Sequence, residues 1–402
     1  MIEKIREKEK FIYAASLIVL LAFFTQLFNF PNKLAVGCMF LICAVYFLMR
    51  KKVVIGLREI LLFFTMLTYI WFSGRRNLTG ISIVLLPLLA QMTGQYLMNG
   101  GEKDTDREKR VWILLGVFVI GYTIHAVLNA KIFLDMGPDY QGRYWLDFWT
   151  SVDTPATQHN IYFLPVLAVV FPAILYIMKQ KAVCIVALAA AAFSIWFSAI
   201  SQSRTPLVIF ALVFVWGILL WVIFHRRDQK ARKIMLIGAV VILAAVAAGA
   251  VFVWFNFDTI QTTRIYTTLH RDGGILHNVR FEAQRNVIRQ LFDYPWGGYQ
   301  MDLVVLEMAH NIWLDTAKAG GLLPFVGLVI YTLLAIYDMV KLLKNANVSS
   351  ALKYVISSLW AALMLYYMVE PALEATVQFI VPWTYMNGIV YMLGKTGTQI
   401  DE

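Results

Sequence analysis

One long polar segment of this chain contains arginines but no lysine. Between Lys233 and Lys318 there is no lysine, yet this stretch contains five arginines: Arg264, Arg271, Arg280, Arg285 and Arg289. A guanidinium group is planar and donates hydrogen bonds in pairs, so it suits bidentate binding of a carboxylate or a phosphate. The pattern therefore predicts a binding site for an anion, and a phosphate is the anion that we favour.

The arginines occupy different faces when residues 279–292 are drawn as a helix. One arc contains the apolar side chains Val287, Leu291, Ile288, Phe281 and Phe292. Arg280 and Gln284 fall inside this arc, Arg289 lies opposite it and Arg285 lies at its edge. A guanidinium that faces apolar surroundings needs a partner. From the sequence, a structural carboxylate and a ligand anion are equally good partners for Arg280.

Two further residues extend this candidate site. Arg204 lies in the short turn Ser201-Gln-Ser-Arg-Thr between two apolar runs, where it either binds an anion or is an ordinary interfacial arginine. His310 follows the arginine segment directly and precedes Asn311. It is either a helix-capping residue or a base, because a neutral imidazole can take a proton from a hydroxyl group.

The elements that position these residues are membrane helices. The chain has 402 residues, 60% of them hydrophobic and only 15% charged, with a mean hydropathy of +0.66. A soluble domain is about 25% charged. Apolar runs long enough to cross a bilayer predict an all-α, polytopic membrane protein with about twelve spans in a single membrane domain, residues 1–402. The predicted spans are 11–30, 34–49, 59–73, 79–98, 111–128, 160–178, 182–200, 205–224, 234–255, 312–340, 351–369 and 376–394.

The distribution of lysine and arginine predicts the orientation. Alternate loops contain the basic groups Arg50-Lys51-Lys52, Lys103–Arg110 and Arg226–Lys233. Basic loops stay cytoplasmic, so both termini are predicted to be cytoplasmic. The same rule explains the net charge of +10 without a nucleic-acid partner. The same orientation predicts two longer outer loops, 129–159 and 256–311. We expect both loops to contain short helices at the membrane surface.

No metal site or cofactor is expected. The three cysteines, Cys38, Cys43 and Cys184, fall inside apolar runs without metal-ligand spacing, so they are predicted to be packing residues.

The order of the motifs resembles the O-antigen ligase and O-antigen polymerase superfamily. The resemblance rests on Ser-Gln-Ser-Arg204-Thr, Arg280-Phe-Glu-Ala-Gln, Tyr-Pro-Trp-Gly-Gly298 and His310-Asn-Ile-Trp-Leu-Asp followed by Gly320-Gly321. It covers about residues 200–325, and elsewhere only the number of spans and the placement of the loops are similar.

The resemblance implies a bacterial glycosyltransferase in the inner (plasma) membrane, with its site on the outer face. The implied donor is a glycan on undecaprenyl diphosphate, and the implied acceptor is a sugar hydroxyl on lipid A-core or on another lipid-linked glycan. Arg204 and Arg280 match the arginines that bind the diphosphate, and His310 matches the histidine that activates the acceptor. Arg264, Arg285, Arg289, Gln284 and Asn311 are supporting candidates for substrate binding. The implied chemistry is metal-independent and inverts the anomeric centre.

Other functions remain open from the sequence. A ligase and a repeat-unit polymerase of this superfamily are hardly distinguished. A twelve-span transporter or a flippase for lipid-linked oligosaccharides is less favoured, because the notable charges cluster at the outer face rather than at the midplane. A peptidoglycan polymerase would need a carboxylate in a large outer loop, for which Asp153 is a candidate.

Overall fold

The structure is a computed structural model. It describes residues 2–29, 32–50, 55–75, 77–98, 104–137, 140, 142–225, 279–304, 306–375 and 377–395. The predicted span 234–255, Arg264, Arg271 and the basic group Arg226–Lys233 lie outside the described residues.

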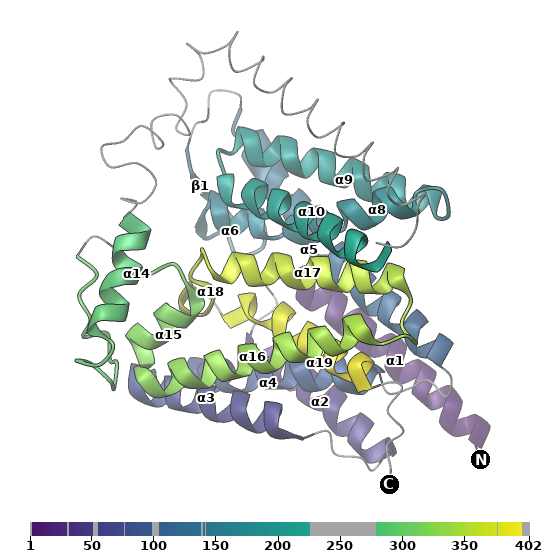
Figure 1. Cartoon of the computed structure of the whole chain (residues 1–402), viewed down its shortest axis with the longest axis horizontal. Helices are drawn as coiled ribbons and strands as arrows, with labels where there is room; N and C mark the ends of the chain where they lie inside the picture. Colours follow the sequence, from purple (N-terminus) through teal and green to yellow (C-terminus); the bar gives the residue numbers. More distant parts are fainter. Residues whose placement is uncertain are drawn as a thin grey trace.

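Long helices run side by side and form one bundle (Figure 1). The helices of the first half are α1 (Ile2–Phe24), α2 (Asn32–Arg50), α3 (Leu57–Ser73), α4 (Leu78–Met98) and α5 (Asp104–Asp135). The later long helices are α9 (Lys181–Ile200), α10 (Arg204–His225), α16 (Leu322–Lys344), α17 (Ser350–Tyr367) and α19 (Val381–Lys395). Among the described residues, six helices are long and apolar enough to cross a membrane: Asn32–Arg50, Gly80–Met98, Arg107–Asp135, Lys181–Ile200, Arg204–His225 and Leu322–Lys344. The expected all-α membrane class is therefore confirmed.

The centre of the bundle is the contact between α4 and α19. A Cβ atom on Gly94 would lie 2.4 Å from the Tyr385 carbonyl oxygen, and one on Gly388 would lie 2.1 Å from the Gln91 carbonyl oxygen. The two glycines therefore let the backbones touch, as small residues do between membrane helices. Around this pair, α2 packs on α4, and α16 packs on both α3 and α19.

Three predicted spans are not single helices. Residues 156–176 form the short helices α6 (Ala156–Ile161), α7 (Leu164–Ala168) and α8 (Val170–Tyr176). Pro165 and Pro172 lie in this stretch, and each lacks the amide hydrogen that a continuous helix needs. Residues 312–344 divide at Gly321 into α15 (Ile312–Gly320) and α16. The last predicted span begins with α18 (Ala372–Ala375) and the 3₁₀ turn η2 (Val377–Phe379) before α19.

The first predicted outer loop, 129–159, contains a β-hairpin as well as the start of the short helix α6. The strands β1 (Tyr144–Leu146) and β2 (Asp153–Pro155) pair antiparallel, between the end of α5 and the start of α6. Asp147 organises the turn, because its Oδ1 accepts hydrogen bonds from the amides of Trp149 (3.1 Å) and Thr150 (3.0 Å). Its Oδ2 accepts from the buried His125 ring at 2.8 Å. The expectation of short helices in 129–159 did not include this hairpin, although the short helix α6 begins within the range. The buried aspartate supplies the hydrogen bonds that close the tight turn of the hairpin.

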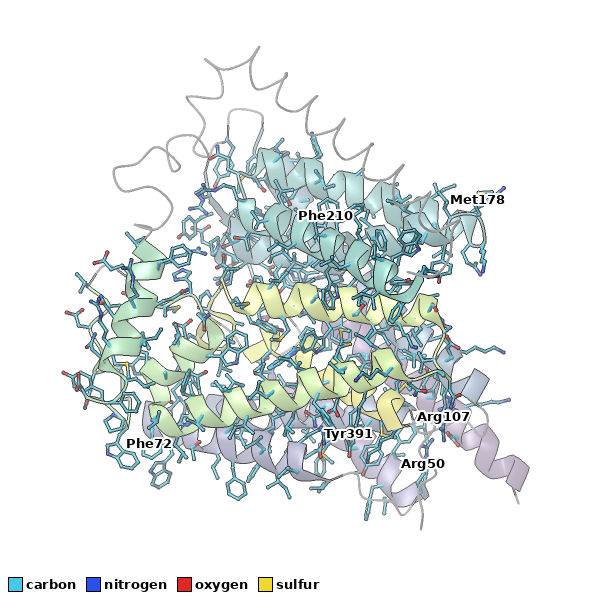
Figure 2. All side chains as sticks on the ribbon, viewed as in Figure 1. Arg50, Phe72, Arg107, Met178, Phe210 and Tyr391 are labelled. Atoms are coloured by element: carbon cyan, nitrogen blue, oxygen red, sulfur yellow. The ribbon has the colours of Figure 1, made fainter. Side chains whose placement is uncertain are left out.

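The second outer segment does contain a short helix. Helix α14 (Val279–Gln290) runs across one end of the bundle, whereas the long helices run along the bundle (Figure 1). It packs on α15 through an apolar cluster. Figure 2 places Phe72 at this end and Arg50 and Arg107 at the opposite end. The candidate site therefore lies at the end of the bundle that carries α14.

Candidate functional site

Arg280 is held by the turn that follows α17. Its Nη1 donates to the carbonyl oxygen of Val369 at 2.7 Å and to Oε1 of Glu370 at 3.3 Å. Glu370 is only 3% exposed, whereas the Arg280 side chain is 32% exposed. Arg280 thus has a structural carboxylate as a partner, and part of its guanidinium still reaches the surface. This answers the question that the sequence left open about its partner, and its role with a ligand stays a prediction.

Glu370 also holds the turn that contains Arg204. Oε1 of Glu370 accepts a hydrogen bond from the Thr205 hydroxyl at 3.2 Å. The turn between α9 and α10 is as short as expected, because Gln202 takes a left-handed conformation (φ 52°) and α10 begins at Arg204. The half-buried Arg204 is therefore the chain neighbour of Thr205, which binds the same carboxylate as Arg280. One buried carboxylate joins two arginine motifs that are far apart in the sequence.

His310 completes this group of residues. Its ring Nδ1 lies 3.0 Å from the Met308 carbonyl oxygen. A carbonyl only accepts, so Nδ1 carries the proton and Nε2 keeps a free lone pair. Burial lowers the pKa of His310, and the nearby Arg280 guanidinium lowers it further, against the opposing effects of the Met308 carbonyl and Glu370. The imidazole is therefore neutral at neutral pH and can act as a base.

The backbone around His310 is fixed by α15. His310 has a left-handed φ of 55°, which is uncommon for a residue with a side chain. The Asn311 side chain caps α15 by accepting from the Trp313 and Leu314 amides at 3.2 Å, and its Nδ2 donates to Met368 at 3.3 Å. The buried Asp315 accepts from the amides of Ala309 and Asn311, at 2.6 and 3.0 Å. Asn311 thus shapes the site, and its predicted contact with substrate stays untested.

The apolar face expected for α14 was partly wrong. Ala283, Val287 and Leu291 are the buried residues, whereas Phe281, Ile288 and Phe292 are exposed. The helix wheel ranked side chains by apolarity alone, and small Ala283 fits closely against α15 where a phenylalanine would not. Gln284, inside the predicted arc, donates to the Ala309 carbonyl oxygen at 3.2 Å, next to His310.

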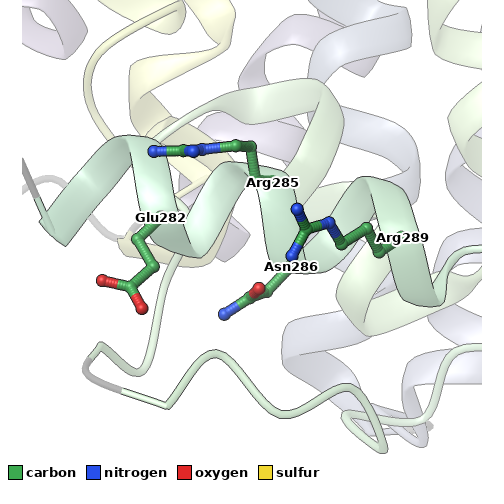
Figure 3. A pocket seen from close by; sticks show the side chains of 4 residues that line it. All are labelled: Glu282, Arg285, Asn286 and Arg289. Carbon is green, nitrogen blue, oxygen red and sulfur yellow. The ribbon is translucent and has the colours of Figure 1, made fainter. Parts of the chain in front are cut away.

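Arg285 and Arg289 do not join Arg280. With Glu282 and Asn286 they line a shallow hollow on the outward side of α14 (Figure 3). At the helical period of 3.6 residues, Arg289 is half a turn around the helix from Arg280. The predicted arginines therefore do not form one group in the structure. Arg280 faces Glu370, whereas Arg285 and Arg289 face outward.

A second ion pair near the site was missed from the sequence. Arg75 Nη2 contacts Glu374 Oε2 at 2.6 Å, and the same oxygen accepts from the Tyr299 hydroxyl at 3.1 Å. Glu374 and Glu370 lie four residues apart in the connection between α17 and α19. The available signal was two carboxylates, Glu370 and Glu374, in one short connection of an otherwise apolar region, where charged side chains are rare and usually paired or functional.

The comparisons with known proteins add no family to this geometry. No family model matches the sequence. No curated protein matches it either. Among the described residues, no group of three or more His, Cys, Asp or Glu side chains is placed to hold a metal ion. The described residues form an α-helical membrane protein whose bundle carries two arginine motifs, a histidine and a buried glutamate at one end.

Proposed function

We propose that this protein is a membrane glycosyltransferase. It transfers a glycan from an undecaprenyl-diphosphate donor to a sugar hydroxyl on a glycan or lipid A-core acceptor, as an O-antigen ligase does. The observation that carries the proposal is the convergence of Arg280, the Arg204–Thr205 turn and His310 around the buried Glu370. A repeat-unit polymerase would use the same centre with a lipid-linked acceptor.

The chemistry requires a base and a stabilised leaving group. Nε2 of His310 takes the proton of the acceptor hydroxyl, the hydroxyl oxygen attacks the anomeric carbon, and the bond from that carbon to the diphosphate oxygen breaks. Undecaprenyl diphosphate leaves with the bonding electron pair. Arg280 and Arg204 stabilise the negative charge that develops on it, and such fixed charges act strongly near a low-dielectric membrane. Attack opposite to the leaving group inverts the anomeric centre.

The arrangement of the bundle supports a site on the outer face of a bacterial inner membrane. Arg50 and Arg107 lie at the end opposite Phe72 and α14 (Figure 2). Cytoplasmic ends of membrane proteins are rich in arginine and lysine. In this proposal the chain has about twelve spans, both termini are cytoplasmic, and the second outer loop reaches from 256 to 311.

The test is glycan transfer by the purified protein in EDTA. The donor is an undecaprenyl-diphosphate glycan, and the variants are His310→Ala, Arg204→Ala and Arg280→Ala. We expect activity of the unchanged protein in EDTA, a loss in kcat on the order of 10²–10⁴-fold for His310→Ala, and a loss on the order of 10²–10³-fold for each arginine variant.

The control is Glu282→Ala on the exposed side of α14, which should keep full activity. Thermal unfolding of every variant separates a lost site from a lost fold. Transfer that is unchanged in the three variants would show that the site is wrong. Movement of a labelled lipid-linked glycan across vesicles without any transfer would favour the flippase instead.

A further inference from the structure

Helix α14 has three distinct sides along its length. Its packed side consists of Ala283, Val287 and Leu291. Next around the helix comes an exposed apolar side formed by Phe281, Ile288 and the following Phe292. Beyond this lie Arg285 and Arg289. The packed side fixes the helix on α15, so the other two sides are presented in a defined direction.

The exposed apolar side is large for a helix of twelve residues. Ile288 is 57% exposed and Phe292 is 76% exposed. Trp296 in the next turn is 65% exposed and packs on Phe72 at the end of α3, with ring centroids 5.2 Å apart and the rings tilted by 34°. Aromatic and apolar side chains gather in this way where a membrane protein meets the boundary between lipid tails and headgroups.

Arg285 and Arg289 lie beside the exposed apolar side, where the phosphate groups of lipids would be if that side entered a bilayer. Arg285 and Arg289 are exposed and share the hollow with Glu282 and Asn286 (Figure 3). They border the exposed apolar side directly, because position 285 follows Phe281 by one helical turn and position 289 follows 285 by another. A helix that lies flat in an interface places apolar side chains in the acyl boundary and basic side chains at the headgroups.

The direction of α14 agrees with this placement. The helix runs across the end of the bundle, whereas the long helices run along the bundle (Figure 1). If those helices cross the membrane, α14 lies parallel to its surface, at the depth of Phe72 and Trp296.

We propose that α14 is a docking surface for anionic phospholipid of the bilayer that surrounds the protein. Phe281, Ile288 and Phe292 enter the acyl boundary, and Arg285 and Arg289 bind lipid phosphates above it. This assigns the second arginine pair to the membrane rather than to the reacting diphosphate. The assignment does not depend on the proposed glycosyl transfer.

Hydrogen exchange of residues 279–292 tests the assignment with the full chain in nanodiscs. One preparation contains phosphatidylcholine alone, and the other contains phosphatidylcholine with phosphatidylglycerol. Each basic residue near an anionic surface contributes about 1 kcal/mol, which is roughly a fivefold change in an equilibrium. We therefore expect α14 amides to exchange roughly 30-fold more slowly in the anionic discs, and the difference should shrink in high salt.

Arg285→Gln with Arg289→Gln should abolish this difference, and Glu282→Gln should leave it in place or increase it. Phe292→Ser should speed exchange in both lipids. The proposal is overturned by equal exchange of the unchanged protein in the two lipids, or by a double variant that keeps the difference. It is also overturned if inorganic phosphate alone slows exchange equally in phosphatidylcholine discs, because the site would then bind a soluble anion.

Discussion

At the scale of single residues, Glu370 contacts both arginine motifs of the predicted site. It is buried, and it holds Arg280 at 3.3 Å and Thr205 at 3.2 Å. A buried carboxylate beside a guanidinium reduces the cost of removing both from water. It also orients Arg280 before any ligand arrives, which is how a positioning residue aids a reaction. The negative charge of Glu370 in addition raises the pKa of His310 against burial and Arg280.

Replacing Glu370 by glutamine should therefore change both rate and pH dependence. Transfer by the unchanged protein should fall as pH drops through the pKa of His310, below its usual value of about 6.5. Glu370→Gln removes a charge that raises this pKa, so the acid side of the kcat/KM profile should move to lower pH. Misplacement of Arg280 should also lower kcat on the order of 10²-fold.

The matched control is Glu374→Gln, four residues further on, which removes the partner of Arg75 instead. Its pH profile should keep the acid limb of the unchanged protein. An unshifted profile for Glu370→Gln would limit Glu370 to a structural role.

At the scale of elements, the turn Tyr294–Gly298 is locked to the break between α15 and α16. Gly298 donates its amide to the Ala319 carbonyl oxygen at 2.8 Å, and Leu322 donates to that of Pro295 at 2.8 Å. Gly297 and Gly321 both have positive φ, 66° and 82°. A Cβ atom on Gly297 would lie 2.3 Å from the Gly321 nitrogen. This contact sets the direction of α15. The first turn of α15 is capped by the Asn311 side chain, next to His310.

Gly297→Ala should destabilise the protein by about 3 kcal/mol, combining left-handed strain with overpacking. Thermal unfolding in detergent measures the loss. Gly37→Ala in α2 is the matched control, because a Cβ atom there meets nothing within 4 Å. That variant should be neutral or slightly stabilising, since alanine favours a helix over glycine. Equal stability of the two variants would contradict the proposed lock.

At the scale of the whole molecule, α1 begins and α19 ends at the same end of the bundle (Figure 1). This is the arrangement that an even number of crossings produces. It agrees with the proposed cytoplasmic termini and with Arg50 and Arg107 at the end opposite α14 (Figure 2). The orientation matters for the proposed function, since it decides on which side of the membrane His310 lies.

Cysteine labelling in whole cells tests this orientation. Ser151→Cys in the exposed hairpin turn and Asn347→Cys in the exposed turn after α16 lie on opposite sides in the proposal. The background replaces Cys38, Cys43 and Cys184 by alanine. A maleimide that does not cross membranes should label position 151 in intact cells and position 347 only after permeabilisation. The reverse pattern would place the Glu370 centre in the cytoplasm.

Local sequence was sufficient for the class of the fold and for several elements. Long apolar runs predicted membrane helices because a bilayer requires about 20 apolar residues in each crossing. The Gly320-Gly321 break and the helix at 279–290 also follow from neighbouring residues. The hairpin at 144–155 was missed, because its turn depends on Asp147 being buried against His125, 22 residues earlier.

The candidate site was only half determined by the sequence. Residue type and order were enough to select Arg204, Arg280 and His310 as candidates. They could not show that Arg280 faces Glu370 while Arg285 and Arg289 face away, nor that Thr205 shares the same carboxylate. Glu370 follows Arg280 by 90 residues, and their contact exists only because α14 packs on α15 and reaches the turn that follows α17. Helical periodicity is a property of neighbours along the chain, whereas the pairing of a buried charge is decided by the tertiary packing around it.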